Sequence, residues 1–248
     1  MKIRIKFRKY GVMKFIGHLD LMRFFQKVMR MADIAICYTE GFSPHQVMSF
    51  AAPLGVGLTS DGEYLDIEVH KTAASADAIQ ALNAVMPDGM EVTGYVRLDD
   101  HAKTGMSIVT AADYEIWFKQ DCEIPDKIRN IEHLKTDLSD FYEKPQEILV
   151  TKKTKKSEKV MDLKKLIYDF QLHPAADSLR SPVFSLLVST GSIDNIKPEL
   201  VLETFFFHIG LFYDPLAVQI HRRDVYYTDP DGAFRTLLEA GEEIQENQ

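Results

Sequence analysis

The sequence predicts an α+β protein built from two ferredoxin-like (split βαβ) units in tandem. Residues 3–7 and 63–70 alternate apolar and polar side chains, which is typical of half-buried strands. Residues 18–32 place apolar side chains at helical spacing. The order strand, helix, strand, strand, helix, strand is complete by residue 98, and it nearly repeats after residue 112.

The first unit is predicted over residues 1–98. Gly11 ends the first strand, and Thr-Glu-Gly-Phe-Ser-Pro-His at 39–45 has the composition of a loop. The sequence Met-Pro-Asp-Gly at 86–89 stops an alanine-rich helix. The predicted elements of this unit are, in order, strand 3–7, helix 18–32, loop 39–45, short apolar runs 47–50 and 54–58, strand 63–70, helix 73–85 and strand 90–98.

A connector at 99–107 leads to the second unit, which is predicted over residues 112–230. Pro125 stands at the first position of a helix, where proline is favoured. Residues 166–178 match neither the helical nor the strand period. Residues 231–248 are assigned as an acidic tail, of which 242–248 are predicted to be frayed. The predicted elements are, in order, strand 113–119, helix 125–141, hairpin strands 148–152 and 159–163 around a turn at 155–157, strand 183–189, helix 198–209 and strand 217–227.

Composition limits the class of protein. The hydrophobic fraction of 46% and the charged fraction of 27% allow a core of normal size. No apolar stretch approaches the roughly 18 residues that a membrane span needs, and the N-terminus has no signal-peptide pattern. A cytoplasmic protein without a membrane partner is therefore predicted.

The cysteine content excludes one kind of cofactor. Cys37 and Cys122 lie 85 positions apart and are expected to be free thiols. An iron–sulfur cluster needs three or four cysteines, so this chain cannot hold one by itself. No glycine-rich phosphate loop or dinucleotide fingerprint is present, and no cofactor is predicted.

The net charge of −8 is unevenly distributed. Residues 1–31 carry nine basic side chains and one acid, and residues 151–165 carry seven lysines and two acids. Basic segments of this kind attract a polyanion locally, but lysines also protect strand edges from aggregation. Both interpretations remain open for the second segment.

The densest group of unusual residues is Lys-Phe-Ile-Gly-His-Leu-Asp-Leu-Met-Arg at 14–23, followed by Tyr-Thr-Glu-Gly-Phe-Ser-Pro-His at 38–45. His18 lies where the first helix begins, and helix N-termini suit anions. A loop that folds over this end would add further polar groups, with Phe42 as a platform for base stacking. The predicted ligand- or nucleic-acid-binding residues are Arg8, Lys14, His18, Arg23, Glu40, Phe42 and His45.

Structural interpretations of the same residues compete with this one. His18 can bond the backbone at the start of the helix, Asp20 can favour the helix dipole, and Phe42 can anchor the loop on the core. Gly41 can supply a positive φ for a turn. No metal site from His18, His45 and Glu40 is predicted, because the chain has no compact metal-ligand spacing. The remaining candidates are assigned structural roles: His133, His173, His208 and His221 as structural histidines, and Phe205, Phe206 and Phe207 as core residues.

The segments GHLDLMRFFQKVMRMA and YTEGFSPHQVMSFAAPLGVG resemble the two signature blocks of the radical SAM-linked protein family. The similarity is close across residues 2–70 and weaker to about residue 226. In that family the module is often an appendage of a cobalamin-binding radical SAM protein. The resemblance therefore implies a radical SAM protein as a partner in trans. Family members usually carry Ser and Asn where this chain has Gly17 and Ser43.

These observations predict an accessory or substrate-recognition module that works with a radical SAM partner, through RNA or an RNA-containing assembly. One alternative is a subunit that only docks on another protein. Another is a metal-independent RNA-processing enzyme with His18 and His45 as acid and base. No catalytic residue is predicted, and the chain is not expected to be an enzyme on its own.

Overall fold

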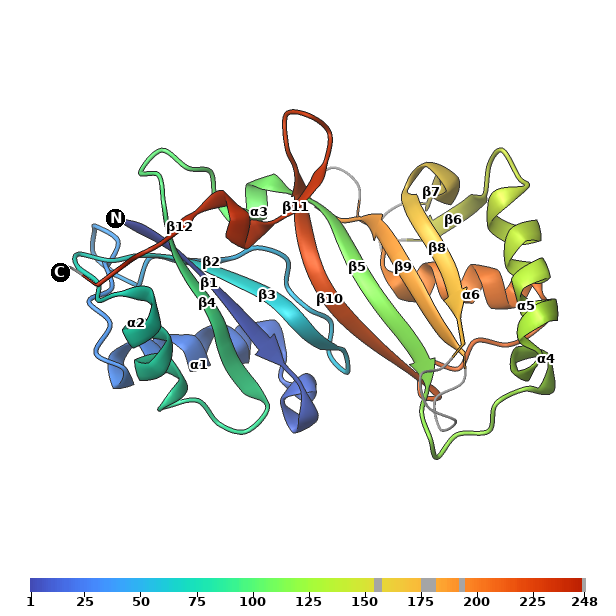
Figure 1. Ribbon diagram of the computed structural model, residues 1–248, viewed down its shortest axis with the longest axis horizontal. Helices are drawn as coiled ribbons and strands as arrows, with labels where there is room; N and C mark the ends of the chain where they lie inside the picture. Colours follow the sequence, from blue (N-terminus) through green and yellow to red (C-terminus); the bar gives the residue numbers. More distant parts are fainter. Residues whose placement is uncertain (154–157, 175–181, 192–194, 247–248) are drawn as a thin grey trace. The chain divides into compact units, whose positions relative to one another are not determined.

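The protein has the mixed α+β architecture that the sequence predicts, with a mostly antiparallel sheet (Figure 1). Within the described ranges, no helix is long and apolar enough to cross a bilayer. Cys37 and Cys122 are free thiols. The structure, a computed structural model, describes residues 1–153, 158–174, 182–191 and 195–246.

Two compact units divide the chain. The first consists of Met1–Ala111 and Arg222–Gln248, and the second consists of Ala112–His221. The C-terminal segment thus belongs to the same unit as the N-terminal segment. Strands β5 (Val109–Phe118) and β10 (Val218–Thr228) contribute residues to both units.

The first unit contains a sheet in which β1 lies between β3 and β4, and β2 pairs with β3. All three of these pairings are antiparallel. Its elements are β1 (Lys2–Lys9), the 3₁₀ helix η1 (Gly11–Phe15), α1 (His18–Met31), β2 (Met48–Phe50), β3 (Thr59–Glu68), α2 (Ser75–Asn83), β4 (Met90–Leu98), α3 (Gly105–Ile108), part of β10, β11 (Phe234–Thr236), η4 (Leu237–Ala240) and β12 (Glu242–Glu243).

The alternation in β1 decides which face of this sheet carries the core. Ile3, Ile5 and Phe7 are fully buried against α1 and α2, which lie on one side of the sheet in Figure 1. The rings of Phe7 and Phe25 approach to 4.7 Å between centroids. Each such side chain contributes about 1.5–3 kcal/mol on burial, so the pattern in β1 fixes the position of both helices.

The opposite face is covered by part of the segment assigned as an acidic tail, which forms β11, η4 and β12. The prediction that residues 242–248 are frayed is wrong for Glu242 and Glu243, which form β12 and pair with β4. Thr236 and Glu239 form a capping box, and Leu237 is fully buried. Leu238 packs where a Cβ on Gly94 would lie, at 2.8 Å. The segment is ordered because it packs on an apolar surface of the sheet and accepts hydrogen bonds from buried donors. A frayed tail would leave these donors unsatisfied.

The second unit contains a sheet of order β10-β5-β9-β8 and a separate antiparallel hairpin of β6 and β7. The predicted turn at 155–157 lies outside the described residues. The elements of this unit are part of β5, α4 (Asp126–Arg129), α5 (Ile131–Leu138), the π-helix η2 (Ser139–Glu143), β6 (Leu149–Lys153), β7 (Glu158–Asp162), η3 (Leu163–Lys165), β8 (Ile167–His173), β9 (Val183–Ser189), α6 (Pro198–His208) and part of β10.

Two features of the second unit differ from the prediction. The helix predicted at 125–141 breaks at Asn130, whose side chain accepts a hydrogen bond from the backbone N–H of His133 and caps α5. Phe207 is 83% exposed rather than part of the core, because α6 turns it away from Phe205 and Phe206. The ambiguous stretch after residue 166 forms strand β8.

We predict that Leu237→Ala lowers the free energy of unfolding by about 2–5 kcal/mol, because it leaves a cavity under η4. Urea denaturation monitored by circular dichroism measures this change. Leu216→Ala, at a side chain that is 77% exposed, is the matched control and changes the free energy by less than about 0.5 kcal/mol. Equal stability of the two variants would contradict an ordered C-terminal segment.

Candidate functional site

The site predicted from the sequence lies on the first unit, at η1, the start of α1 and the loop 39–45. α1 begins at His18, after the N-cap Gly17. The His18 ring packs edge-on against Phe50, with 5.3 Å between centroids and 88° between the planes. Its Nδ1 is buried and has no hydrogen-bond partner within the described part of the chain. The imidazole therefore faces an apolar environment and does not bond the backbone through this atom.

The two arginines of the predicted site already have carboxylate partners. The Arg8 guanidinium lies 3.3 Å from Asp61 and 3.2 Å from Glu91. Arg23 lies 3.3 Å from Asp20 on the exposed surface of α1. Exposed pairs of this kind contribute about 0–1 kcal/mol to stability, so an anion would displace the carboxylates from the arginines at a small cost in free energy. The neighbouring acidic side chains would also repel this anion.

Lys14 connects η1 to the second signature block. Its carbonyl accepts a hydrogen bond of 2.8 Å from the backbone N–H of Gly57. Its ammonium lies 5.4 Å from the centroid of the Phe15 ring, in a cation–π contact. η1 and the segment around Gly57 therefore lie against each other.

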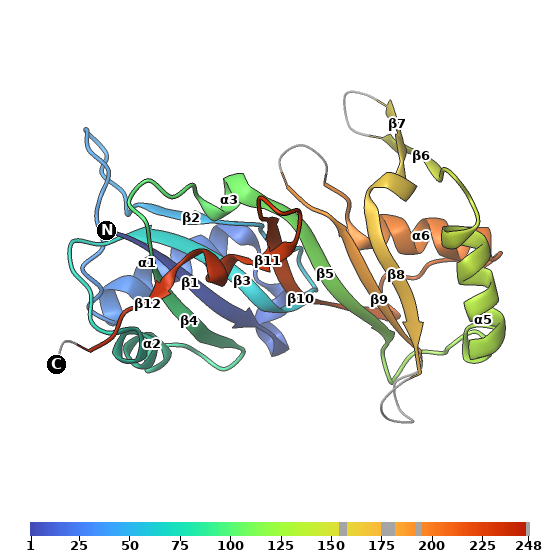
Figure 2. The ribbon, with the colours of Figure 1, turned by 45° about the horizontal axis from the view of Figure 1, so that its top comes forward.

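The loop 39–45 projects from the sheet as the blue segment at the left of Figure 2. The backbone N–H of Thr39 donates to the His45 carbonyl at 2.8 Å, and the backbone N–H of His45 donates to Thr39 Oγ1 at 3.1 Å. These two hydrogen bonds close the loop. Gly41 has a φ of 110°, so the interpretation that it supplies a positive φ is confirmed. Phe42 is fully exposed at the tip, so the interpretation of Phe42 as a core anchor is wrong. Glu40 is exposed beside it.

The predicted binding residues form no common cluster through their contacts. Within the described residues, the side chain of His18 contacts Phe50, and His45 Nδ1 lies near Thr39 Oγ1 and the Ser43 carbonyl, at 3.1 and 3.4 Å. Arg23 contacts only Asp20 there. The described ranges hold no group of three or more His, Cys, Asp or Glu side chains that could bind a metal ion.

A buried polar network that the sequence analysis missed holds both signature blocks. Lys9, 1% exposed, donates from Nζ to the Ile16 carbonyl at 2.7 Å. Arg222 donates to Glu63 at 3.0 Å and to the Ala52 carbonyl at 2.5 Å. Burial lowers the pKa of Lys9, and the nearby Arg222 lowers it further, while Glu63 raises it. Ile16 directly precedes the first signature block and Ala52 lies in the second, so the network fixes the backbone next to the first block and within the second.

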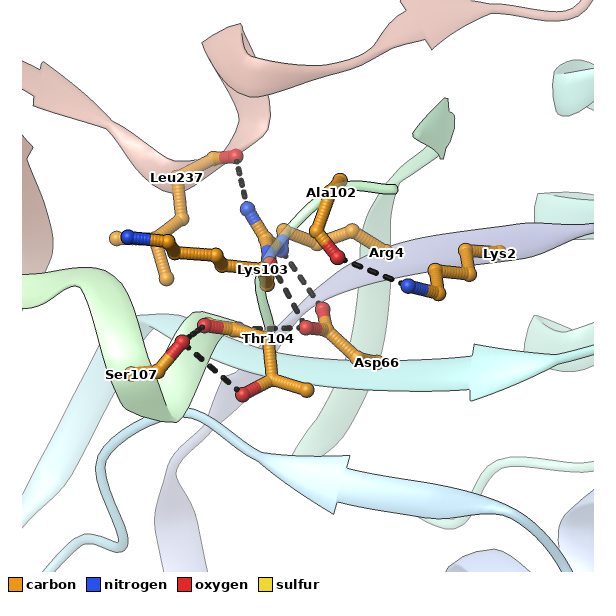
Figure 3. A network of polar contacts seen from close by, with 9 residues as sticks. Lys2, Arg4, Asp66, Ala102, Lys103, Thr104, Ser107 and Leu237 are labelled. Atoms are coloured by element: carbon orange, nitrogen blue, oxygen red, sulfur yellow. Dashed lines mark hydrogen bonds and ion pairs between the residues drawn. The ribbon is translucent and has the colours of Figure 1, made fainter. Parts of the chain in front are cut away.

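A second network joins the sheet to the C-terminal segment (Figure 3). The fully buried Arg4 donates to Asp66 in bidentate fashion, at 2.7 and 2.9 Å. The same guanidinium donates to the Leu237 carbonyl at 3.1 Å. The Gly105 N–H donates to the second Asp66 oxygen at 2.6 Å. Every oxygen of this carboxylate thus has a donor, and η4 and α3 are both tied to β1 and β3.

A third buried group lies further along the same face. Lys6 Nζ is 2.6 Å from an Asp224 oxygen, and the Tyr64 hydroxyl donates to the other oxygen at 2.8 Å. Burial of the Tyr64 hydroxyl, together with the Asp224 charge, raises the pKa of Tyr64. The alternation of β1 predicts only that these charges share a face. The sequence gives no signal that β10 lies beside β3 in the sheet or that η4 covers this face, because these segments lie more than 200 positions away from β1.

We predict that the stability of the wild type rises relative to Lys9→Met as pH increases from the lowered pKa of folded Lys9 to the ordinary lysine pKa of 10.5. In this range the unfolded chain binds the proton that the folded chain has released, so the free energy of unfolding increases with pH. Guanidinium denaturation at several pH values measures the difference. Lys27→Met, at an exposed lysine of α1, serves as the control. A difference that stays constant up to pH 10.5 would contradict the lowered pKa.

Comparison with known proteins identifies a family, and its matches to solved structures include a distant one. A chain of the "Crystal Structure of a Cbf5-Nop10-Gar1 Complex" is similar with a TM-score of 0.46 and 10% identity, covering 89% of this chain and 47% of that chain. This chain thus spans about half the length of that one, and a similarity at this level defines no function. None of the curated proteins matches this chain. Residues 2–198 match the family described as "Uncharacterized protein conserved in bacteria (DUF2344)", and because the match covers most of the sequence, the chain belongs to this bacterial family.

Proposed function

We propose that this protein is an accessory module that docks on a partner protein through an apolar edge formed by η1 and parts of its two signature blocks. The apolar edge consists of Val12, Phe15, Leu19 and Val56. The partner in this proposal is the radical SAM protein that the sequence resemblance implies. A cytoplasmic location is part of the same proposal.

The observation that carries the proposal is the exposure of these four side chains. Val12, Phe15, Leu19 and Val56 are 75%, 65%, 63% and 60% exposed, respectively. Large apolar side chains that gather in one exposed region mark interaction sites. η1 and the first turn of α1 carry three of them, and the hydrogen bond from Gly57 to η1 brings the fourth close.

Buried contacts hold the apolar edge in place. Ile16 lies between Phe15 and the start of α1, and its carbonyl is the acceptor of the Lys9 ammonium. On the other block, Ala52 precedes the segment that carries Val56 and is held by Arg222. Pre-organisation of this kind lowers the entropic cost of binding. The polar network therefore supports docking, although none of its members lies on the apolar edge.

RNA binding is the second candidate, and Phe42 is the observation that favours it. A fully exposed aromatic ring at a loop tip can stack on a base. The strand orders β4-β1-β3-β2 and β10-β5-β9-β8 support the proposal of two ferredoxin-like units, and sheets of that kind often bind RNA. The open sheet face that such binding uses is absent from the first unit, however, because Leu237 and Leu238 of η4 cover it.

The enzymatic alternative has less support. His18 packs on Phe50, and His45 bonds to Thr39 within its own loop. A general acid and a general base need to lie within hydrogen-bond reach of one substrate. The contacts of these two histidines involve different parts of the unit. Docking is therefore preferred to catalysis as the proposed function.

We predict that Phe15→Ser/Leu19→Ser reduces recovery of the radical SAM protein at least about tenfold, because interface anchors of this size contribute about 2 kcal/mol or more. The measurement is a pull-down of the tagged chain from its native cell extract, followed by mass spectrometry of a half treated with RNase and an untreated half. Met31→Ser, at a side chain that is 64% exposed at the other end of α1, is the matched control and retains the partner.

The same experiment separates the two candidates. Recovery of the radical SAM protein in both halves supports direct docking. Loss of that protein after RNase treatment, or loss of RNA in Phe42→Ala, would favour an RNA-mediated role. Failure to recover a radical SAM protein from either half would contradict the proposed partner.

A further inference from the structure

The exposed face of α1 carries a row of basic side chains, which we call the basic row: Arg23, Lys27 and Arg30. They follow one another at spacings of four and three residues. Because an α-helix has about 3.6 residues per turn, side chains at these spacings lie on one face. All three are exposed. The opposite face of the helix packs on the core through Leu21, Phe25, Val28 and Met29.

Most of the charge of the basic row is not neutralised. Among the described residues, Arg23 pairs with Asp20 at 3.3 Å, and the side chains of Lys27 and Arg30 have no hydrogen-bond or ion-pair partner. Asp20 is the only acid within α1. A phosphate can displace it from Arg23, because exposed pairs of this kind contribute little to stability. An anion that lies along the helix therefore meets three cations.

The loop 39–45 starts beside the middle of α1 and adds two aromatic rings. Gln46 Nε2 donates to the Gln26 carbonyl of α1 at 3.2 Å and to the Tyr38 hydroxyl at 3.4 Å. Tyr38 and Gln46 also pair across the base of the loop. Tyr38 is half exposed, and Phe42 at the projecting tip is fully exposed (Figure 2). The base of the loop thus lies against the helix that carries the basic row.

Cations in a row and exposed rings beside them match the two parts of a nucleic acid strand. Guanidinium groups bind phosphate oxygens in bidentate fashion, and lysine binds them as a point charge. Every base has an aromatic face that stacks on a protein ring, which is how single strands are bound without base pairing. An acidic peptide would also satisfy the cations, but it gives the exposed rings nothing to stack on. The combination therefore favours a nucleic acid over an acidic protein.

We propose that α1 and this loop together bind a single-stranded nucleic acid. The phosphates contact the basic row, and the bases stack on Phe42 and Tyr38. This surface lies on the helical side of the first unit, so it does not need the sheet face that η4 covers. None of its side chains belongs to the apolar edge. The inference therefore goes beyond docking, and it holds whether or not the partner protein binds.

The test uses the purified full chain without any partner, titrated into a fluorescein-labelled uridine oligonucleotide of about 12 nucleotides, a length within the range that such surfaces cover. Fluorescence anisotropy at several KCl concentrations gives the Kd and its salt dependence. We expect saturable binding that weakens as salt rises, with a slope of about 0.7 per phosphate contacted. Arg23→Gln/Lys27→Gln/Arg30→Gln is expected to raise the Kd at least about tenfold and to reduce this slope by about 2.

A matched control separates local contacts from total charge. Lys71→Gln/Lys103→Gln/Lys197→Gln removes the same number of charges at exposed lysines outside α1 and leaves the Kd nearly unchanged. Phe42→Ala is expected to raise the Kd at least about fivefold through lost stacking. Its control is Phe212→Ala, at a ring that is 89% exposed outside the proposed surface, which binds like the wild type.

Further outcomes decide the class of ligand. A DNA oligonucleotide of the same length shows whether the surface prefers RNA, and binding of either strand supports the proposal. Circular dichroism confirms that the variants are folded. The proposal is overturned if neither oligonucleotide binds saturably, or if the folded α1 variant or Phe42→Ala binds like the wild type. It is also overturned if poly-L-glutamate displaces the strand as well as unlabelled oligonucleotide does, since that result indicates an acidic protein partner.

Discussion

The buried ion pair between Arg4 and Asp66 is the constraint on which the first unit depends. A fully buried guanidinium is costly unless each of its donors finds an acceptor. Asp66 supplies two oxygens and the Leu237 carbonyl supplies a third acceptor. The C-terminal segment must therefore return to the sheet, which covers its second face and removes an open sheet surface.

Charged side chains on β1 thus organise the unit as much as its apolar ones do. Ile3, Ile5 and Phe7 place α1 on one face, and the intervening charges attach other segments to the opposite face. After the irregularity at the end of β1, Lys9 donates to the carbonyl of Ile16, directly before the first signature block. The start of this block is in this way held on a rigid support.

Local patterns allowed much of the fold to be predicted, and long-range contacts account for the rest. The alternation of β1 and the helical spacing after His18 depend on neighbouring residues, and both elements agree with the structure. The C-terminal segment differs because its order depends on Arg4, 233 positions away from Leu237. For the site, the position of His18 at a helix start was predicted. For Phe42, an exposed stacking platform and a buried anchor both stayed open, because composition does not show which way a loop projects, and the structure shows the ring exposed.

A double-mutant cycle on Arg4 and Asp66 tests the central claim most directly. Arg4→Met or Asp66→Leu alone leaves one buried charge without its partner and is expected to cost about 3–5 kcal/mol of the free energy of unfolding. The double variant Arg4→Met/Asp66→Leu removes both charges. The account predicts that it costs less than the sum of the single changes, by about 2 kcal/mol or more. Additive costs would contradict the claim that this pair is the interaction on which the unit depends.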